Sequence, residues 1–98
     1  MYGTVARMRA KPGSGEQVLA VMREYEDIEI PGFVATYFYR LDDNENDYYM
    51  AVVFEDRESY RRNADEPAQD ERYRRLRELL DDDPKWHDGE IIWVAEKR

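Results

Sequence analysis

The chain has 98 residues, 42% of them hydrophobic and 39% charged, and its net charge is −8. This length predicts a single domain over residues 1–98, and the acidic charge disfavours nucleic acids and anionic membranes as partners. The chain has no cysteine and one histidine, which excludes disulfides and thiolate metal sites and argues against a transition-metal site. With no signal peptide and no membrane-spanning run, we expect a cytoplasmic protein.

The first third of the chain predicts a strand followed by a helix. Residues 2–10 form the strand, and a Gly-rich turn leads to a helix of about four turns, in which apolar residues recur every three or four positions. Ser14 and Gln17 have the spacing of a capping box at its start. Pro31 and Gly32 end it.

The rest of the chain predicts a hairpin, two helices and a last strand. Aromatic and β-branched residues indicate strands at 33–41 and 48–55. A short helix follows at 57–63, a longer one starts near Pro67, and the run EIIWVA predicts a strand at 90–95. The order β-α-β-β-α-β predicts an α+β fold of the ferredoxin-like type, with a four-stranded antiparallel sheet and both helices on one face.

The predicted strands are apolar on both faces. In the second strand, Thr36 and Phe38 lie on one face, and Phe33, Tyr37 and Tyr39 lie on the other. Two helices cover only one face of a sheet, whereas an antiparallel sheet with one wet face alternates apolar and polar residues. A second copy of the chain is the simplest cover for the other face, so we expect a homodimer packed sheet to sheet.

Four stretches carry a family resemblance: YGTVARMRAKPG, PGFVATYFYR, FEDRESYRRN and PKWHDGEIIWV. With these stretches, the sequence resembles the antibiotic biosynthesis monooxygenase (ABM) domain family of the dimeric α+β barrel superfamily. The resemblance implies a dimeric α+β barrel with a pocket between each sheet and its helices. It also implies a monooxygenase that oxidises a small phenolic or quinol-type aromatic with O₂, with no metal or flavin cofactor.

Three residues are candidates for catalysis. Asn63 and Tyr73 resemble pocket residues of the quinol-oxidising branch, where they would orient the substrate oxygen. His87 is the only side chain whose unperturbed pKa lies near neutrality, which suits a proton acceptor. The alternatives are a surface-loop histidine for His87 and a left-handed helix end for Asn63.

Aromatic side chains are candidates for holding a flat ligand. We predict that Trp86 stacks on the substrate ring and that Tyr37 and Tyr49 also contact the substrate. Because Tyr is enriched at interfaces, the dimer interface is the alternative for the tyrosines. Trp93, in the predicted last strand, is assigned to the core or to the interface.

The longer helix contains a basic stretch of four arginines: Arg72, Arg74, Arg75 and Arg77. The pairs Asp70–Arg74 and Glu71–Arg75 have the i,i+4 spacing of a salt-bridged exposed face. The alternative is that one arginine reaches a pocket and holds an anionic substrate.

Two other functions stay open from the sequence. A non-catalytic dimer on the same scaffold could bind a small molecule as a sensor or accessory protein. An isomerase or lyase of the same superfamily would need an acid–base pair and no oxygen.

Overall fold

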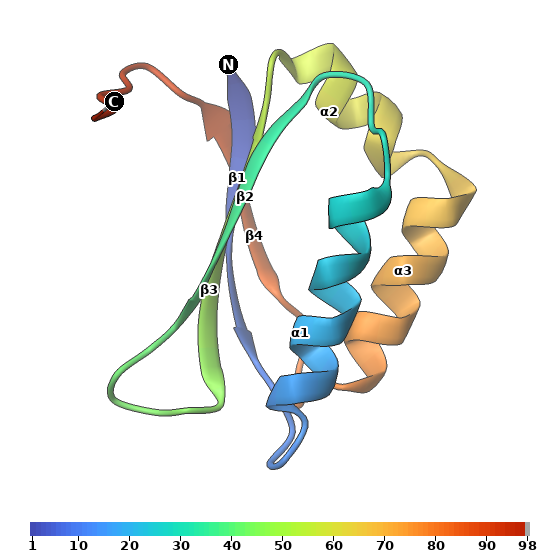
Figure 1. Ribbon diagram of the computed structural model, residues 1–98, viewed down its shortest axis with the longest axis vertical. Helices are drawn as coiled ribbons and strands as arrows, with labels where there is room; N and C mark the ends of the chain where they lie inside the picture. The colour runs from blue at the N-terminus through green and yellow to red at the C-terminus, as the bar shows by residue number, and fades with distance from the viewer. Residues whose placement is uncertain (98) are drawn as a thin grey trace.

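A four-stranded antiparallel sheet, in the order β2-β3-β1-β4, forms one layer of the computed structural model, which describes residues 1–97. The helices form a second layer on one side of the sheet (Figure 1). This confirms the ferredoxin-like α+β fold. The elements are β1 (Tyr2–Arg9), α1 (Gly15–Arg23), the 3-10 helix η1 (Glu24–Asp27), β2 (Phe33–Arg40), β3 (Asp47–Phe54), α2 (Arg57–Ala64), α3 (Pro67–Glu78) and β4 (Lys85–Glu90).

The ends of the helices follow local signals in part. The Asp56 carboxylate accepts a hydrogen bond from the Ser59 backbone N–H at 2.8 Å, which caps α2, and Pro67 opens α3 as predicted. Ser14 precedes α1, but its side chain makes no capping hydrogen bond, so the predicted capping box does not form. The α-helical part of the first helix ends at Arg23, and the tighter η1 continues it.

The predicted strand at 90–95 is wrong. β4 is Lys85–Glu90, with Lys85 opposite Arg7 and Glu90 opposite Tyr2, and residues 91–97 form no regular structure. Backbone pairing with β1 outweighs the weak strand propensity of KWHDGE, whereas the apolar run that follows has no strand beside it in residues 1–97. His87 therefore lies on a strand.

The core lies between the sheet and the helices. Leu80 and Val18 are fully buried there, and the Phe38 ring stacks on that of Tyr48 with centroids 4.7 Å apart. Other members of this core are Ala6, Met8, Ala10, Met50 and Leu76. Within residues 1–97, no helix has the length and hydropathy needed to cross a membrane.

A register irregularity in β2 changes the face on which Phe33 lies. Phe33 and Ala35 pair with the adjacent residues Phe54 and Val53 of β3, so Val34 is an extra residue in β2. The rings of Phe33 and Phe54 meet edge to face, with centroids 5.7 Å apart. Phe33 therefore faces the helices, and the predicted alternation fails at this point.

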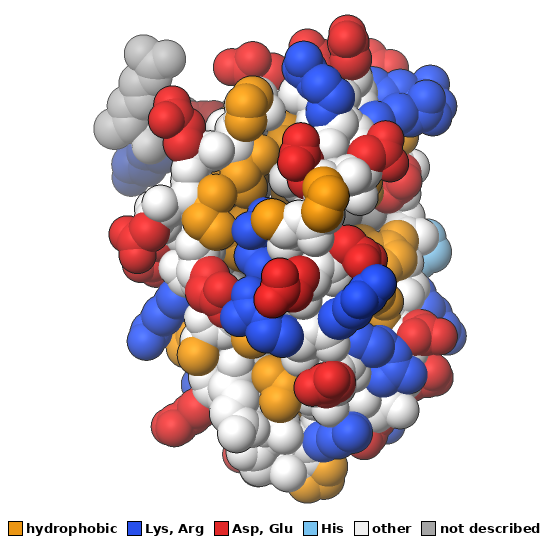
Figure 2. All heavy atoms as spheres, turned by 90° about the vertical axis from the view of Figure 1, so that its right-hand side faces the viewer, with side chains coloured by type: hydrophobic (Ala, Val, Ile, Leu, Met, Phe, Trp, Pro, Cys, Tyr) orange, Lys and Arg blue, Asp and Glu red, His pale blue; other side chains and the backbone are white. Residues whose placement is uncertain are grey.

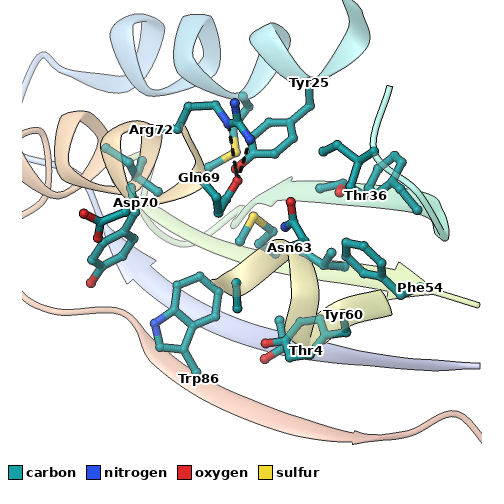
Figure 3. Close-up of a pocket in the computed structure, with 18 of the residues that line it drawn as sticks. Thr4, Tyr25, Thr36, Phe54, Tyr60, Asn63, Gln69, Asp70, Arg72 and Trp86 are labelled. Carbon is teal, nitrogen blue, oxygen red and sulfur yellow. Dashed lines mark hydrogen bonds between the residues drawn. The ribbon is translucent and has the colours of Figure 1, made fainter. Parts of the chain in front are cut away.

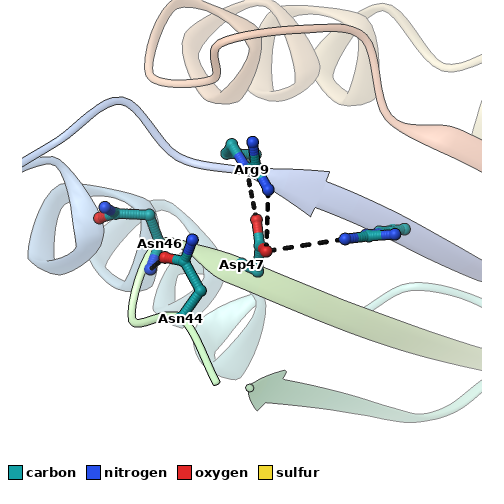
Figure 4. Close-up of polar contacts among 5 residues, drawn as sticks. Arg9, Asn44, Asn46 and Asp47 are labelled. Atoms are coloured by element: carbon teal, nitrogen blue, oxygen red, sulfur yellow. Dashed lines mark hydrogen bonds and ion pairs between the residues drawn. The ribbon is translucent and has the colours of Figure 1, made fainter. Parts of the chain in front are cut away.

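The other face of the sheet, which we call the open face, has no helix over it (Figure 1). Its large exposed residues are Val5, Tyr37, Tyr39 and Tyr49. Figure 4 shows a polar contact at its edge, where the Asp47 carboxylate accepts hydrogen bonds of 2.6 and 3.0 Å from Arg9 and lies 3.6 Å from Arg7.

Candidate functional site

A cavity of about 400 Å³ lies between the sheet and the helices. Its wall is mainly apolar, with side chains from α1, the strands and α3: Val21, Met22, Phe33, Met50, Phe54 and Leu76. Polar groups gather at its two ends and beside Asn63 (Figure 3). This size, and an apolar wall with a few polar groups, are typical of sites for small organic molecules.

Asn63 projects from α2 into this cavity (Figure 3). Its backbone carbonyl accepts a hydrogen bond from Glu66 at 3.1 Å, while its side-chain amide has no hydrogen-bond partner within residues 1–97. No residue there other than glycine has a positive φ, so the alternative of a left-handed helix end does not apply. The amide therefore offers N–H donors and a carbonyl acceptor to a ligand.

Tyr73 and Trp86 form an aromatic part of the cavity wall. Tyr73 comes from α3 and Trp86 from β4, and their ring centroids are 6.2 Å apart with planes tilted by 52°. Trp86 is 41% exposed, which places it near the mouth of the cavity. The structure thus brings three of the predicted site residues together: Asn63, Tyr73 and Trp86.

His87, Tyr37 and Tyr49 do not line this cavity. On β4, His87 stands between Trp86 and Asp88, which both line it, so strand alternation directs the imidazole to the open face. Tyr37 and Tyr49, 58% and 38% exposed, lie on the open face as well. The roles predicted for these three side chains stay predictions.

One end of the cavity carries a polar group that the sequence did not indicate. The Tyr60 hydroxyl donates to the Asp88 carboxylate at 2.9 Å. Burial, together with the neighbouring Asp88 carboxylate, raises the pKa of Tyr60 to about 12, so this hydroxyl stays protonated at neutral pH. Thr4, opposite Asp88 in the β1–β4 register, has a buried hydroxyl with no hydrogen-bond partner within residues 1–97. The β1–β4 register brings Thr4 and Asp88 together, and Tyr60 reaches them from α2.

The other end holds Tyr25, Gln69 and Arg72 (Figure 3). The Gln69 side-chain oxygen accepts hydrogen bonds from the Tyr25 hydroxyl at 2.8 Å and from Arg72 Nη2 and Nε at 3.0 and 3.3 Å. The Arg72 guanidinium lies 5.1 Å from the centre of the Tyr25 ring, a cation–π contact. This end is therefore rich in hydrogen-bond donors.

The helix side of the molecule is covered by interleaved acidic and basic side chains (Figure 2). The predicted pair Asp70–Arg74 forms at 2.9 Å, but Arg75 binds Glu24 at 2.7 Å in place of Glu71. Arg72 departs further from the prediction, since it is only 9% exposed and faces the cavity. No group of three or more His, Cys, Asp or Glu in residues 1–97 is arranged to hold a metal ion.

The fold and this cavity define a small ferredoxin-like protein with a ligand-sized site between sheet and helices. A family model described as antibiotic biosynthesis monooxygenase (ABM) matches residues 1–71. The chain belongs to this family.

Solved structures share the whole fold. One from Chloroflexus aurantiacus, a candidate antibiotic biosynthesis monooxygenase, has a TM-score of 0.81 at 19% identity and covers 97% of this chain and 96% of its own. SnoaB from Streptomyces nogalater, a cofactor-independent oxygenase, has a TM-score of 0.78 at 22% identity, with 98% and 97% covered. A conserved protein from Methanosarcina mazei has 0.80 at 18%, with 90% and 89% covered. Among curated proteins, none matches the chain.

Proposed function

We propose that this protein is a cytoplasmic, homodimeric monooxygenase that oxidises a small phenolic or quinol-type aromatic with O₂, without metal or flavin. Membership of the ABM family supports a monooxygenase-type role. The cavity supports an aromatic substrate, because its volume of about 400 Å³ and its apolar and aromatic wall suit a flat ring system.

The unpartnered amide of Asn63 is the observation that carries this proposal. In the reaction, a base removes a proton from the substrate, and the negative charge gathers on the substrate oxygen and on the carbon beside it. An N–H donor held in an apolar cavity stabilises such developing charge without reorganising. Asn63 would bind this oxygen, Tyr73 would help to orient it, and Trp86 would stack on the ring.

The proposed chemistry balances without a further co-reactant. The substrate carbanion passes one electron to O₂, and the resulting radical and superoxide combine into a peroxide. The peroxide takes up the proton that the base removed. The second proton then leaves the same carbon as the C=O bond forms and the O–O bond breaks, and this proton and the departing hydroxide form water. For a CH₂ group flanked by aromatic rings, the sum is R₂CH₂ + O₂ → R₂C=O + H₂O.

Two side chains on β4 compete for the role of base. His87 is the base that the sequence predicts, because an imidazole is suited to proton transfer, but its side chain lies on the open face. Asp88 lines the cavity, and its carboxylate accepts a hydrogen bond from the Tyr60 hydroxyl at 2.9 Å. We therefore favour Asp88 as the base.

Oxygen uptake tests the proposal. Chelator-treated protein is mixed with anthrones, quinols and catechols, and uptake is corrected for spontaneous oxidation. We expect catalysed uptake that falls about 100-fold or more in Asn63→Ala, the loss typical of an oxyanion donor. Asn46→Ala, in the hairpin loop away from the cavity, is the matched control and should keep full activity.

The same assay separates the two bases. Loss of uptake in Asp88→Asn, with activity kept in His87→Ala, supports Asp88. The reverse result returns the role to His87. Full activity in Asn63→Ala, with catalysed uptake present, would refute the site assignment.

A non-catalytic ligand-binding dimer is the second candidate. The observation that favours it is the position of His87, because the cavity then holds no imidazole. A ligand that co-purifies unchanged in native mass spectrometry, with no uptake on the panel, would favour this alternative. Turnover without oxygen would point instead to an isomerase or lyase.

The open face supports the homodimer. Tyr37 and Tyr39 are 58% and 54% exposed on it, and the apolar segment after β4 is exposed as well, with Ile92 at 91% and Trp93 at 79%. This segment runs away from the sheet on the side opposite the helices (Figure 1). A second copy packed on the open face would cover both the aromatic side chains and the segment.

A further inference from the structure

We propose that the ligand of this cavity is an aromatic carboxylate whose anionic group binds Arg72. The inference rests on the proposed function, because it takes the cavity to be the substrate site. It adds that the substrate is negatively charged and that Arg72 binds the charged group.

Arg72 is a nearly buried cation without a carboxylate partner. It is 9% exposed, and within residues 1–97 no Asp or Glu forms an ion pair with it. Three other arginines of the same helix are paired: Arg74, Arg75 and Arg77. Buried charges are normally paired, because leaving water costs several kcal/mol per ion in order-of-magnitude terms. An anionic ligand would supply the missing partner.

The hydrogen bonds at this end show a surplus of donors. Tyr25 and two nitrogens of Arg72 all donate to one neutral oxygen, that of Gln69. Arg72 Nη1 has no hydrogen-bond partner among residues 1–97. Asp70 also lines the cavity, but its carboxylate is paired with Arg74 at 2.9 Å. Within residues 1–97, no carboxylate pairs with the guanidinium of Arg72, so its N–H donors can receive an anionic group of a ligand.

The aromatic side chains near Arg72 favour the main cavity for an aromatic anion. Arg72 also borders a second cavity of about 340 Å³, whose charged lining residues besides Arg72 are Arg62, Glu29 and Glu66. None of the residues lining this second cavity is aromatic, so it offers no ring on which an aromatic ligand could stack. In the main cavity, Arg72 contacts the neutral Gln69 and Tyr25. Of the two acidic residues in its lining, Asp70 is paired with Arg74, and Asp88 lies at the far end beside Tyr60.

A carboxylate fits this site better than a phosphate. One guanidinium presents a planar pair of N–H donors that matches the two oxygens of a carboxylate, whereas a phosphate carries more charge than one arginine offsets. The remaining wall is mainly apolar, with Tyr73 and Trp86 for the ring. The ligand would span the cavity, with its carboxylate at Arg72 and a ring oxygen near Asn63.

A matched pair of ligands tests the inference by isothermal titration calorimetry. The probes are anthraquinone-2-carboxylate and its neutral carboxamide, and the readout is the ratio of their dissociation constants. We expect the acid to bind the wild-type protein about 10- to 100-fold more tightly, the range of a charge-assisted hydrogen bond. In Arg72→Met the ratio should fall to about one. Arg74→Met removes the same charge from an exposed side chain and should keep the preference.

Gln69→Glu gives a second test that preserves Arg72. It places a carboxylate where the Gln69 oxygen now binds the guanidinium, so Arg72 gains an internal partner. We expect the acid preference to vanish while the melting temperature is kept or rises. This variant keeps the inference testable if Arg72→Met does not fold.

Three results would overturn the inference: equal binding of acid and amide by the wild-type protein, an acid preference that survives in both variants, or no binding of either probe. They are separable from failure of the proposed oxygenase. Catalysed oxygen uptake with neutral anthrones, together with equal binding of acid and amide by the wild-type protein, would keep the oxygenase and reject the carboxylate. A preference for the acid in binding, with no oxygen uptake on any acidic or neutral substrate, would support the carboxylate site and reject the oxygenase.

Discussion

Asp47 is a carboxylate at the edge of the open face whose side chain is only 8% exposed. Its hydrogen bonds to Arg9 lower its pKa below the usual range, and the positive charges of Arg9 and Arg7 lower it further. Desolvation opposes this shift but does not cancel it. A carboxyl group whose pKa is lower in the folded than in the unfolded state stabilises the fold above the unfolded pKa. That stabilisation is lost as the pH falls through the folded pKa.

We therefore expect Asp47→Asn to lower the melting temperature at pH 7 and to flatten its fall on the acid side. The measurement is the melting temperature from pH 7 to pH 3, compared with wild type. Asp43→Asn, in the exposed hairpin loop, is the control and should follow the wild-type curve. Coinciding curves for Asp47→Asn and wild type would show that the Arg9 pair contributes no net stability, and parallel but displaced curves would show that the loss does not depend on the ionisation of Asp47.

Single positions also show how much of the site the sequence can predict. Asn63, Tyr73 and Trp86 were predictable, because residue chemistry and family resemblance together point to them. His87 illustrates the limit, since adjacent residues on a strand face opposite sides and the strand was predicted a few residues too late. The sequence does not distinguish Arg72 from the exposed arginines of the same helix. Its burial follows from the packing of α3 against η1, where it contacts the Tyr25 ring.

Leu80, just after α3, connects that helix to the sheet. It is fully buried and forms an isolated bridge with Ala10. We expect Leu80→Ala to lower the free energy of unfolding by about 2–5 kcal/mol, because the lost burial is joined by the cost of a cavity. Leu19→Ala, at a position 39% exposed on α1, should change it by less than about 0.5 kcal/mol. Urea denaturation measures both, and equal losses would contradict this account of the core.

The elements differ in how far local sequence decides them. β2 and β3 were predictable because aromatic and β-branched residues have strong strand propensity, and Pro67 marks the start of α3. β4 was displaced because its sequence is polar and its pairing partner, β1, is remote in the chain. The bulge at Val34 likewise depends on the register with β3, which composition does not encode.

The helices cover one side of the sheet, and no helix covers the other side, the open face (Figure 1). A row of aromatic side chains crosses the open face beside apolar positions of β1 and β3. The exposed residues Ile92, Trp93 and Val94 extend past β4 on that side. Such a combined surface is larger than the scattered apolar residues of an ordinary monomer. In the proposed dimer His87 would face the partner, which gives it a place in assembly independent of catalysis.

We expect the wild-type protein to have twice the chain mass in light scattering coupled to size-exclusion chromatography at micromolar concentration. Tyr37→Glu, which places a charge where Tyr37 lies opposite Ala51, should shift the protein toward monomer because a carboxylate must lose its water on assembly. Removing residues 91–98 should weaken the dimer as well. Leu19→Glu makes the same kind of change on the helix side and should leave the dimer intact. A wild-type monomer, or a Tyr37→Glu variant as dimeric as Leu19→Glu, would mean that the open face is not the interface.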